Sequence, residues 1–389
     1  MTPRDQVTPS SVFEQPDPVT LGFHPPAFER LCRVIAAHVE EGRYPGAQIA
    51  FARRGKIAFT RSFGSARLAP KPVAADDETL WLLYSNTKVI VAAAIWILVE
   101  EGALTFHDRV TDHIPDFARY GKGEITLFQL LTHQAGFPAA GMDIRPSVWQ
   151  DHDEMRRLIC DFQLEWTPGS RVEYHRLAAH WTLAMVIEAV TKIDYRKFLR
   201  ERIIDPLGLG HELFVGVPDS EMPRVADMYT SPGPGQAHTP LGAENSAEFR
   251  RAGSPGSGGY ASARAMAMFY QALVNGGSLN GVRLLSPRLI QYVIRNFTGD
   301  RVDVHIGAPM HRGMGVQTRG HSADIRGPGT LASPSTFGHG GVESSFCLGD
   351  PESGMSFAYI TNGRAPNPWH SRRLDIVCSM AAAALQELR

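Results

Sequence analysis

Apolar residues form one uninterrupted run in the first third of the chain. Every residue from Val89 to Val99 is apolar, and Gly102 follows as a helix stop. The run is too short to cross a bilayer, and a helix that is apolar on all sides is normally buried. The pattern therefore predicts a buried central helix within residues 82–102.

Strand-like patterns occur near both ends of the chain. Residues 46–51 and 57–63 form one predicted hairpin, and residues 344–348 and 355–361 form another around a turn at 350–354. Helical spacing of apolar residues is found beside these strands, over 28–41 and 374–388. The middle of the chain is mainly helical, over 128–133, 153–162, 178–191, 195–204, 261–275 and 287–296, with one further candidate strand over 310–317.

This distribution predicts an α+β architecture. We expect one antiparallel sheet, built from residues 28–80 and 286–389 and flanked by the first and last helices. An all-helical domain of residues 81–285 is inserted between the two parts of the sheet domain, and residues 1–27 form an irregular, proline-containing arm. The cleft between sheet and helices is the expected functional site.

Composition excludes several classes of protein. The chain has 389 residues, a formal net charge of −1 and four cysteines that form no Cys-x-x-Cys pair. A disulfide framework, a zinc site and a nucleic-acid partner are therefore not expected. The first twenty residues lack the basic and apolar regions of a secretory signal, so we expect a cytoplasmic protein without membrane insertion. We expect no cofactor and no metal ion, and the oligomeric state is open.

Ser85 and Lys88 stand three residues apart where the central helix begins, so they lie on one face of it. Ser85 is the only serine of the chain with a lysine three residues later. Burial lowers the pKa of a lysine, and a neutral lysine beside a serine can activate the hydroxyl as a nucleophile. The alternative is a helix-start serine followed by an exposed lysine.

Two further segments carry candidate chemistry. Tyr174, followed by His175 and Arg176, precedes the helix predicted at 178–191, and a tyrosine whose pKa is lowered by a nearby cation can relay protons. The segment 337–342, Phe-Gly-His-Gly-Gly-Val, leads into a strand, and its glycines allow a ligand to approach the backbone. Taken alone, each segment is also compatible with ordinary packing or a tight turn.

In this order, the three segments resemble the serine β-lactamase-like superfamily of class C β-lactamases, DD-peptidases and family VIII carboxylesterases. Further stretches resemble family landmarks from about residue 28 to the C-terminus, at 44–47, 63–64, 130–136, 256–262 and 350–354. The resemblance implies Ser85 as the acylated nucleophile, Lys88 as its base and Tyr174 as the proton shuttle. It also implies an oxyanion hole formed by the backbone N–H groups of Ser85 and Val342.

The chain departs from the lactamase pattern at two places. Tyr-x-Asn is replaced by Tyr174-His175-Arg176, and Lys-Thr-Gly is replaced by His339-Gly340-Gly341. The second change removes a lysine and a hydroxyl that would meet a substrate carboxylate, although Arg176 can restore the charge. The substituted residues, His175, Arg176, His339, Gly340 and Gly341, are the candidate substrate-binding residues.

These departures favour a carboxylesterase that acts on small to medium acyl esters, with a small-molecule ester as its partner. The alternatives are a β-lactamase or D-alanyl-D-alanine peptidase, an acyltransferase that uses the same acyl-enzyme, and a non-catalytic binding paralogue. Four aromatic residues are candidates for an acyl pocket, with ordinary partial burial as the alternative: Trp149, Trp166, Tyr229 and Phe249.

Overall fold

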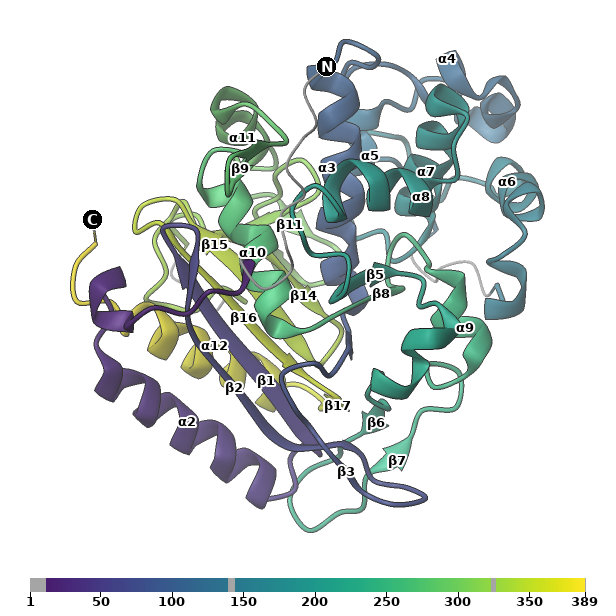
Figure 1. Ribbon diagram of the computed structural model, residues 1–389. Helices are drawn as coiled ribbons and strands as arrows, with labels where there is room; N and C mark the ends of the chain where they lie inside the picture. The colour runs from purple at the N-terminus through teal and green to yellow at the C-terminus, as the bar shows by residue number, and fades with distance from the viewer. Residues whose placement is uncertain (1–11, 139–143, 323–326, 389) are drawn as a thin grey trace.

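The computed structural model describes residues 12–138, 144–322 and 327–388, and a seven-stranded antiparallel sheet is its largest element (Figure 1). The strand order is β13-β14-β15-β16-β1-β2-β3, so strands from the two ends of the chain meet at the β16–β1 pair. The predicted α+β architecture is confirmed. The strands are β1 (Gly46–Arg53), β2 (Lys56–Arg67), β3 (Val73–Ala74), β13 (Gln317–Thr318), β14 (Phe337–Gly341), β15 (Ser345–Asp350) and β16 (Met355–Thr361).

Both predicted hairpins are present, and their turns explain why. Arg54 and Gly55, between β1 and β2, have φ values of 55° and 76°. Two consecutive left-handed residues give the hairpin turn whose twist matches that of the flanking strands. Between β15 and β16, Gly354 has φ 74° and its N–H donates to the Asp350 carbonyl at 2.9 Å.

Helices cover both faces of the sheet. α2 (Pro25–Glu40) and α12 (Trp369–Ala382) lie on one face, where Phe28, Phe51 and Phe357 share a buried cluster (Figure 1). α10 (Ala263–Val274) packs on the opposite face against β1, β15 and β16. α10 belongs by sequence to the range 81–285, but it covers the sheet.

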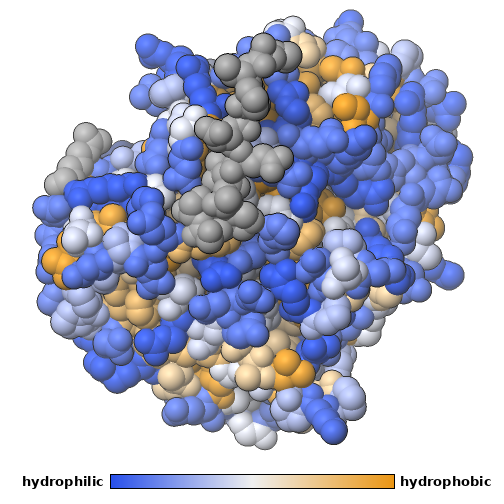
Figure 2. Space-filling model, viewed as in Figure 1, coloured by the Kyte–Doolittle hydropathy of each residue, from blue (hydrophilic) through white to orange (hydrophobic). Residues whose placement is uncertain are grey.

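The remaining helices surround α3 (Thr87–Glu100), whose residues are all buried from Thr87 to Leu98, as predicted. They are α4 (Val110–His113), α5 (Leu127–Leu131), α6 (His152–Asp161), α7 (Ala178–Thr191), α8 (Tyr195–Leu199), α9 (Ala247–Ala252) and α11 (Pro287–Val293). None of the helices in the described ranges is both long and apolar enough to span a membrane. The face shown in Figure 2 is mostly hydrophilic, with apolar residues in small separate patches.

Short strands complete the fold. A three-stranded sheet, β4-β8-β5, consists of Trp81–Leu82, Gly259–Ala261 and Leu213–Val215, and a second, β17-β6-β7, consists of Gly363–Arg364, Tyr229–Thr230 and Thr239–Pro240. Two-stranded ribbons are formed by β9 (Ser278–Leu279) with β10 (Val282–Arg283) and by β11 (Val302–Asp303) with β12 (Ala308–Pro309).

Four details of the sequence prediction were wrong. The domain predicted over 81–285 is not all-helical, because the short strands β4 to β10 lie within it. The strand predicted over 310–317 is mostly irregular, because Gly315 is left-handed at φ 85° and the Gly313 N–H donates back to the Val316 carbonyl. The closing helix spans Trp369–Ala382 and not 374–388. The arm is not irregular throughout: Val12 is fully buried and Pro18–Leu21 form a 3₁₀ turn, whereas residues 1–11 lie outside the described part.

Candidate active site

Ser85 lies in a 3₁₀ turn, Tyr84–Asn86, directly before α3 and not within the helix itself. The Asn86 amide fixes this turn by donating to the Leu83 carbonyl at 3.1 Å and to Ser345 Oγ, on β15, at 3.0 Å. Lys88, in the first turn of α3, donates from Nζ to Ser85 Oγ at 3.1 Å. The turn and the helix therefore bring the two side chains together as the sequence predicted.

The ammonium group of Lys88 is fully buried and has two further acceptors. Nζ donates to the carbonyls of Arg176 at 2.9 Å and of Gly256 at 2.7 Å. Burial, together with the charges of Arg312 and Arg176, lowers the pKa of Lys88 to about 7. A Cβ on Gly256 would lie 3.3 Å from Nζ, so the absence of a side chain there leaves room for the lysine. Near neutral pH, Lys88 is available as a base.

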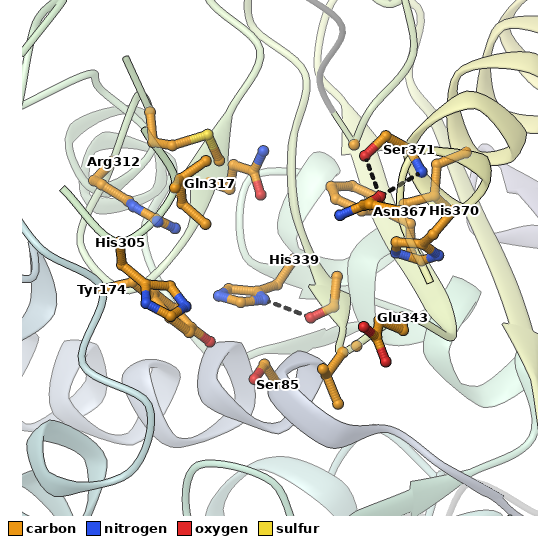
Figure 3. A pocket seen from close by; sticks show the side chains of 18 residues that line it. Ser85, Tyr174, His305, Arg312, Gln317, His339, Glu343, Asn367, His370 and Ser371 are labelled. Carbon is orange, nitrogen blue, oxygen red and sulfur yellow. Dashed lines mark hydrogen bonds between the residues drawn. The ribbon is translucent and has the colours of Figure 1, made fainter. Parts of the chain in front are cut away.

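Tyr174 lies beside both Ser85 and Lys88: its ring centre is 5.2 Å from Lys88 Nζ, and its hydroxyl points toward Ser85 (Figure 3). Burial raises the pKa of the phenol to about 12, although the Ser85 hydroxyl and Arg312 act in the opposite direction. We expected a cation to lower this pKa, but desolvation outweighs the guanidinium, which lies 5.0 Å from the ring centre. The phenol is therefore protonated at rest, and its buried oxygen has no hydrogen-bond partner among the described residues.

The backbone around Tyr174 is fixed by two residues that were not singled out from the sequence, Asp303 and His133. Asp303, fully buried on β11, accepts the Tyr174 N–H at 3.2 Å and pairs with Arg312 Nη2 at 2.7 Å. On the other side, His133 Nδ1 accepts the His175 N–H at 3.1 Å, and the His133 carbonyl accepts the Glu173 N–H at 3.0 Å. Tyr174 is thus positioned by main-chain hydrogen bonds on both sides.

His175 and Arg176 do not line the cavity beside Ser85. The His175 ring is buried, its Nε2 accepts the Ala135 N–H at 3.1 Å, and it stacks on Phe137 with ring centres 5.1 Å apart. Burial lowers the pKa of His175 to about 3, so the ring is neutral. The Arg176 side chain is exposed outside the cavity, and only its carbonyl reaches Lys88.

The segment 339–342 does border the cavity, at the C-terminal end of β14. The His339 ring donates from Nδ1 to the Gly340 carbonyl at 2.8 Å, and burial lowers the pKa of His339 to about 3, so the ring carries no charge. A Cβ on Gly341 would lie 2.9 Å from the Leu83 carbonyl, so only glycine lets β14 approach the serine turn this closely. Val342 follows β14 and lines the same cavity as Ser85.

A cavity of 390 Å³ lies over Ser85 and Tyr174 (Figure 3). One wall is the end of β14, and another is the β11–β12 hairpin, which contributes His305 and Ile306. The far end lies at the first turns of α12. The four aromatic residues considered for an acyl pocket are not among the residues that line it.

One group of potential metal-ligating side chains occurs in the described part of the chain, away from this cavity. His152, Glu188 and Asp194 bring one ligand atom each within 4.8 Å of the others. His152 Nδ1 is hydrogen-bonded to Glu188 at 2.7 Å, and Arg196 pairs with Asp194 at 2.6 Å. These contacts join α6, α7 and α8, so the group acts as a structural brace.

The site also contains residues that sequence reasoning missed. Gly256 lies within the landmark stretch 256–262 but received no role, and Asp303, Arg312 and His133 were not singled out. His133 lies within the landmark stretch 130–136, which was therefore a usable signal. Asp303 and Arg312 carry no local pattern, because their role depends on contacts with Tyr174, far away in sequence.

Known proteins resemble this chain over most of its length. A protein of Escherichia coli (strain K12), provisionally named a D-alanyl-D-alanine carboxypeptidase, is 26% identical over 94% of this chain and 91% of its own. A penicillin-binding protein homologue from Caulobacter crescentus is 29% identical, with a TM-score of 0.80 over 94% of this chain and 99% of its own. A family VIII carboxylesterase is also 29% identical, with a TM-score of 0.78 over 92% and 98%.

The family assignment follows from a match that covers most of the chain. Residues 31–377 match the model of the family described as Beta-lactamase. The structural relatives have the same fold, and the predicted resemblance to the serine β-lactamase-like superfamily is confirmed. The chain therefore belongs to the Beta-lactamase family and is a serine hydrolase of the β-lactamase fold.

Proposed function

We propose that this protein is a carboxylesterase that hydrolyses neutral esters of small to medium acyl chains through an acyl-enzyme on Ser85. The observation that carries the proposal is the charge of the cavity. Among the described residues that line it there is no lysine, and the histidine at position 339, where the lactamase-type triplet has lysine, is neutral. A substrate carboxylate would therefore lack the cation expected in lactam and peptide enzymes.

The two charged side chains at the cavity wall are both compensated. Arg312 pairs with the buried carboxylate of Asp303 at 2.7 Å, and Glu343 pairs with Arg364 at 3.0 Å. A paired guanidinium attracts an anionic substrate less than a free one does, because its charge is already offset. Ile306, Met310 and Phe346 add apolar surface to the same cavity. Such a cavity suits an uncharged ester.

In the proposed mechanism, Lys88 acts as the base for Ser85. Nζ lies 3.1 Å from Ser85 Oγ, and its lowered pKa allows the neutral amine to accept the hydroxyl proton as Oγ attacks the ester carbonyl. The backbone N–H groups of Ser85 and Val342 stabilise the oxyanion of the tetrahedral intermediate.

Tyr174 completes each half of the reaction. Its protonated hydroxyl donates a proton to the departing alkoxide, and the proton held by Lys88 restores the phenol. Water, activated by the same pair, then attacks the acyl-enzyme and releases the acid and free Ser85. Because Lys88 and Tyr174 exchange a proton, the titration of activity belongs to the pair. An alcohol in place of water would give acyl transfer.

The comparisons offer a second candidate. The similarity to a family VIII carboxylesterase supports the ester proposal, whereas the relatives provisionally named D-alanyl-D-alanine carboxypeptidases support a peptidase. Arg312 is the structural feature that favours the peptidase, because it is the one described cation on the cavity wall. A non-catalytic paralogue is disfavoured by the Ser85–Lys88 hydrogen bond.

A substrate comparison distinguishes these functions. The wild-type protein and Ser85→Ala are assayed with p-nitrophenyl acetate and butyrate, a chromogenic cephalosporin and a peptide ending in D-Ala-D-Ala. We expect ester hydrolysis by the wild type to exceed turnover of the other two substrates and to be lost in Ser85→Ala. Preferential turnover of the cephalosporin or the peptide would overturn the proposal, and ester hydrolysis by Ser85→Ala would overturn the assignment of the nucleophile.

A further inference from the structure

Two residues beside the proposed oxyanion donors have left-handed backbones. Tyr84, directly before Ser85, has φ 45°, and Glu343, directly after Val342, has φ 50°. Neither is glycine, so each is strained by its Cβ. Strained residues persist only where the surrounding structure holds them, and here they flank both amides proposed to bind the oxyanion.

A chain of side chains connects these two residues. Tyr84 Oη donates to Glu244 Oε1 at 3.1 Å, and Arg364 Nη1 lies 3.7 Å from the same carboxylate oxygen. Arg364 then donates to Glu343 Oε2 from Nη2 at 3.0 Å and from Nε at 3.2 Å. Arg364 is therefore the bridge between two carboxylates, one at each strained residue.

Burial and backbone hydrogen bonds restrict the movement of the residues that this bridge connects. Tyr84 is 5% exposed, and the side chain of Glu244 is 17% exposed. The Glu343 carbonyl accepts the Ala365 N–H at 3.0 Å, which fixes that residue beside Arg364 on β17. Arg364 itself is not among the residues that line the cavity.

We propose that Arg364 is a positioning residue that holds the Ser85 and Val342 amides in register by bridging Glu244 and Glu343. This role rests on the proposed ester hydrolysis. It affects how strongly the protein stabilises the transition state and not how strongly it binds the ester. Because an oxyanion hole acts where charge develops, misplacing it lowers kcat more than it raises KM. Arg364 acts through Tyr84 and Glu343 and touches no substrate.

The first test is Arg364→Met, which keeps much of the side-chain volume and removes the charge. We expect kcat for p-nitrophenyl butyrate to fall about 10- to 100-fold, because losing a single oxyanion donor outright costs about 10²- to 10³-fold. KM should change by less than about threefold. The matched control is Arg196→Met, since Arg196 pairs with Asp194 at comparable side-chain exposure, 27% and 35% against 32% and 34% for Arg364 and Glu343.

The variant Glu343→Gly distinguishes a positioning role of Arg364 from a general loss of protein stability. Glu343→Ala removes the carboxylate but keeps the Cβ, whereas glycine adopts a φ of about +50° without strain. We expect Glu343→Ala to lower kcat about as much as Arg364→Met does, and Glu343→Gly to lower it several-fold less. In the Glu343→Gly background, adding Arg364→Met should cost less than about threefold, because the strained residue to which Arg364 donates directly has gone.

The outcomes distinguish this proposal from the proposed function. Wild-type protein that hydrolyses esters, together with an Arg364→Met variant that matches Arg196→Met in kcat, would overturn the positioning role alone. Equal losses in Glu343→Ala and Glu343→Gly would also overturn it. Wild-type protein that neither hydrolyses esters nor is labelled on Ser85 by a p-nitrophenyl phosphonate would overturn both proposals.

Discussion

The two sides of the cavity differ in how they are built. On one side, Lys88 is buried and Tyr174 is half-buried: Lys88 Nζ donates to a main-chain carbonyl, and the Tyr174 N–H donates to the Asp303 carboxylate. On the other, the β11–β12 hairpin contributes the aliphatic side chain of Ile306, which lines the cavity and is 48% exposed. The reacting groups therefore have one well-defined environment, whereas the opposite wall presents apolar surface to whatever enters.

This difference separates reactivity from substrate choice. A base needs a desolvated, invariant position to keep its lowered pKa, whereas an exposed hairpin can change its side chains without loss of core packing. Asp303 connects the two sides, because it is the buried residue at the end of β11 in the hairpin and also accepts the Tyr174 N–H. Substitutions of Asp303 should therefore affect both reactivity and substrate choice, whereas a substitution on one side of the cavity should affect only one of the two.

The largest effect is expected on the buried side. Lys88→Ala removes the proposed base, and kcat/KM for p-nitrophenyl butyrate should fall by about 10³-fold, within the range known for general base catalysis. The matched control is Lys122→Ala, which removes another buried lysine, one whose pKa is also lowered by burial but which does not line the cavity. Kinetics in which both variants lose activity equally would contradict the assignment of Lys88.

The second effect is the dependence of activity on pH. Burial holds the pKa of Lys88 at about 7, and only the neutral amine can accept the Ser85 proton. As pH falls below this pKa, kcat/KM should decrease by about tenfold per unit, and above it activity should level off. The phenol, with a pKa of about 12, stays protonated throughout this range. A profile that is flat from pH 5 to pH 8 would exclude Lys88 as the base.

The third prediction concerns Asp303, which connects the two sides of the cavity. Asp303→Asn leaves the guanidinium of Arg312 buried without its carboxylate, and the free energy of unfolding should fall by about 3 kcal/mol. Chemical denaturation measures this loss, and assays with a neutral ester and its carboxylate-bearing analogue measure whether the freed cation shifts preference toward the anion. The control is Asp219→Asn, whose exposed ion pair should contribute little. Unchanged stability and preference in Asp303→Asn would contradict the account.

The smallest effect is expected on the exposed side. Ile306→Asn removes apolar surface from the cavity wall, so KM for p-nitrophenyl butyrate should rise about three- to tenfold while that for the acetate stays nearly constant. Val302→Asn is the control, because Val302 is similarly exposed but does not line the cavity. Steady-state kinetics that show equal changes for both esters would place the acyl chain elsewhere.

Sequence reasoning located the buried side better than the exposed one. Ser85, Lys88 and the strand at 339–342 were recognisable because each lies in a short local pattern, and the order of those patterns resembled one superfamily. The helix over Val89–Val99 was equally clear, since a run that is apolar on all faces has few alternatives to burial. The exact start of that helix was not predicted, because Ser85 lies in a turn shaped by a contact with Ser345.

The rest depended on contacts between distant segments. Arg312 lies in the stretch 310–317, whose apolar residues suggested a strand, but its ion pair with Asp303 and the left-handed Gly315 give this stretch an irregular path. The same holds for Arg364, which acts on residues that precede it by at least 21 positions. His175 illustrates the reverse error: its neighbour Tyr174 faces the cavity, but its own ring points into the core.

The central claim is that a neutral ester acylates Ser85, and mass spectrometry of the protein during turnover tests it most directly. Wild-type protein is mixed with p-nitrophenyl butyrate, quenched in acid within the first turnovers and digested, with Ser85→Ala treated in parallel. We expect one butyryl group on the peptide that contains Ser85 in the wild type and none in the variant. Butyrylation at another residue, or ester hydrolysis without any acylated peptide, would contradict this claim.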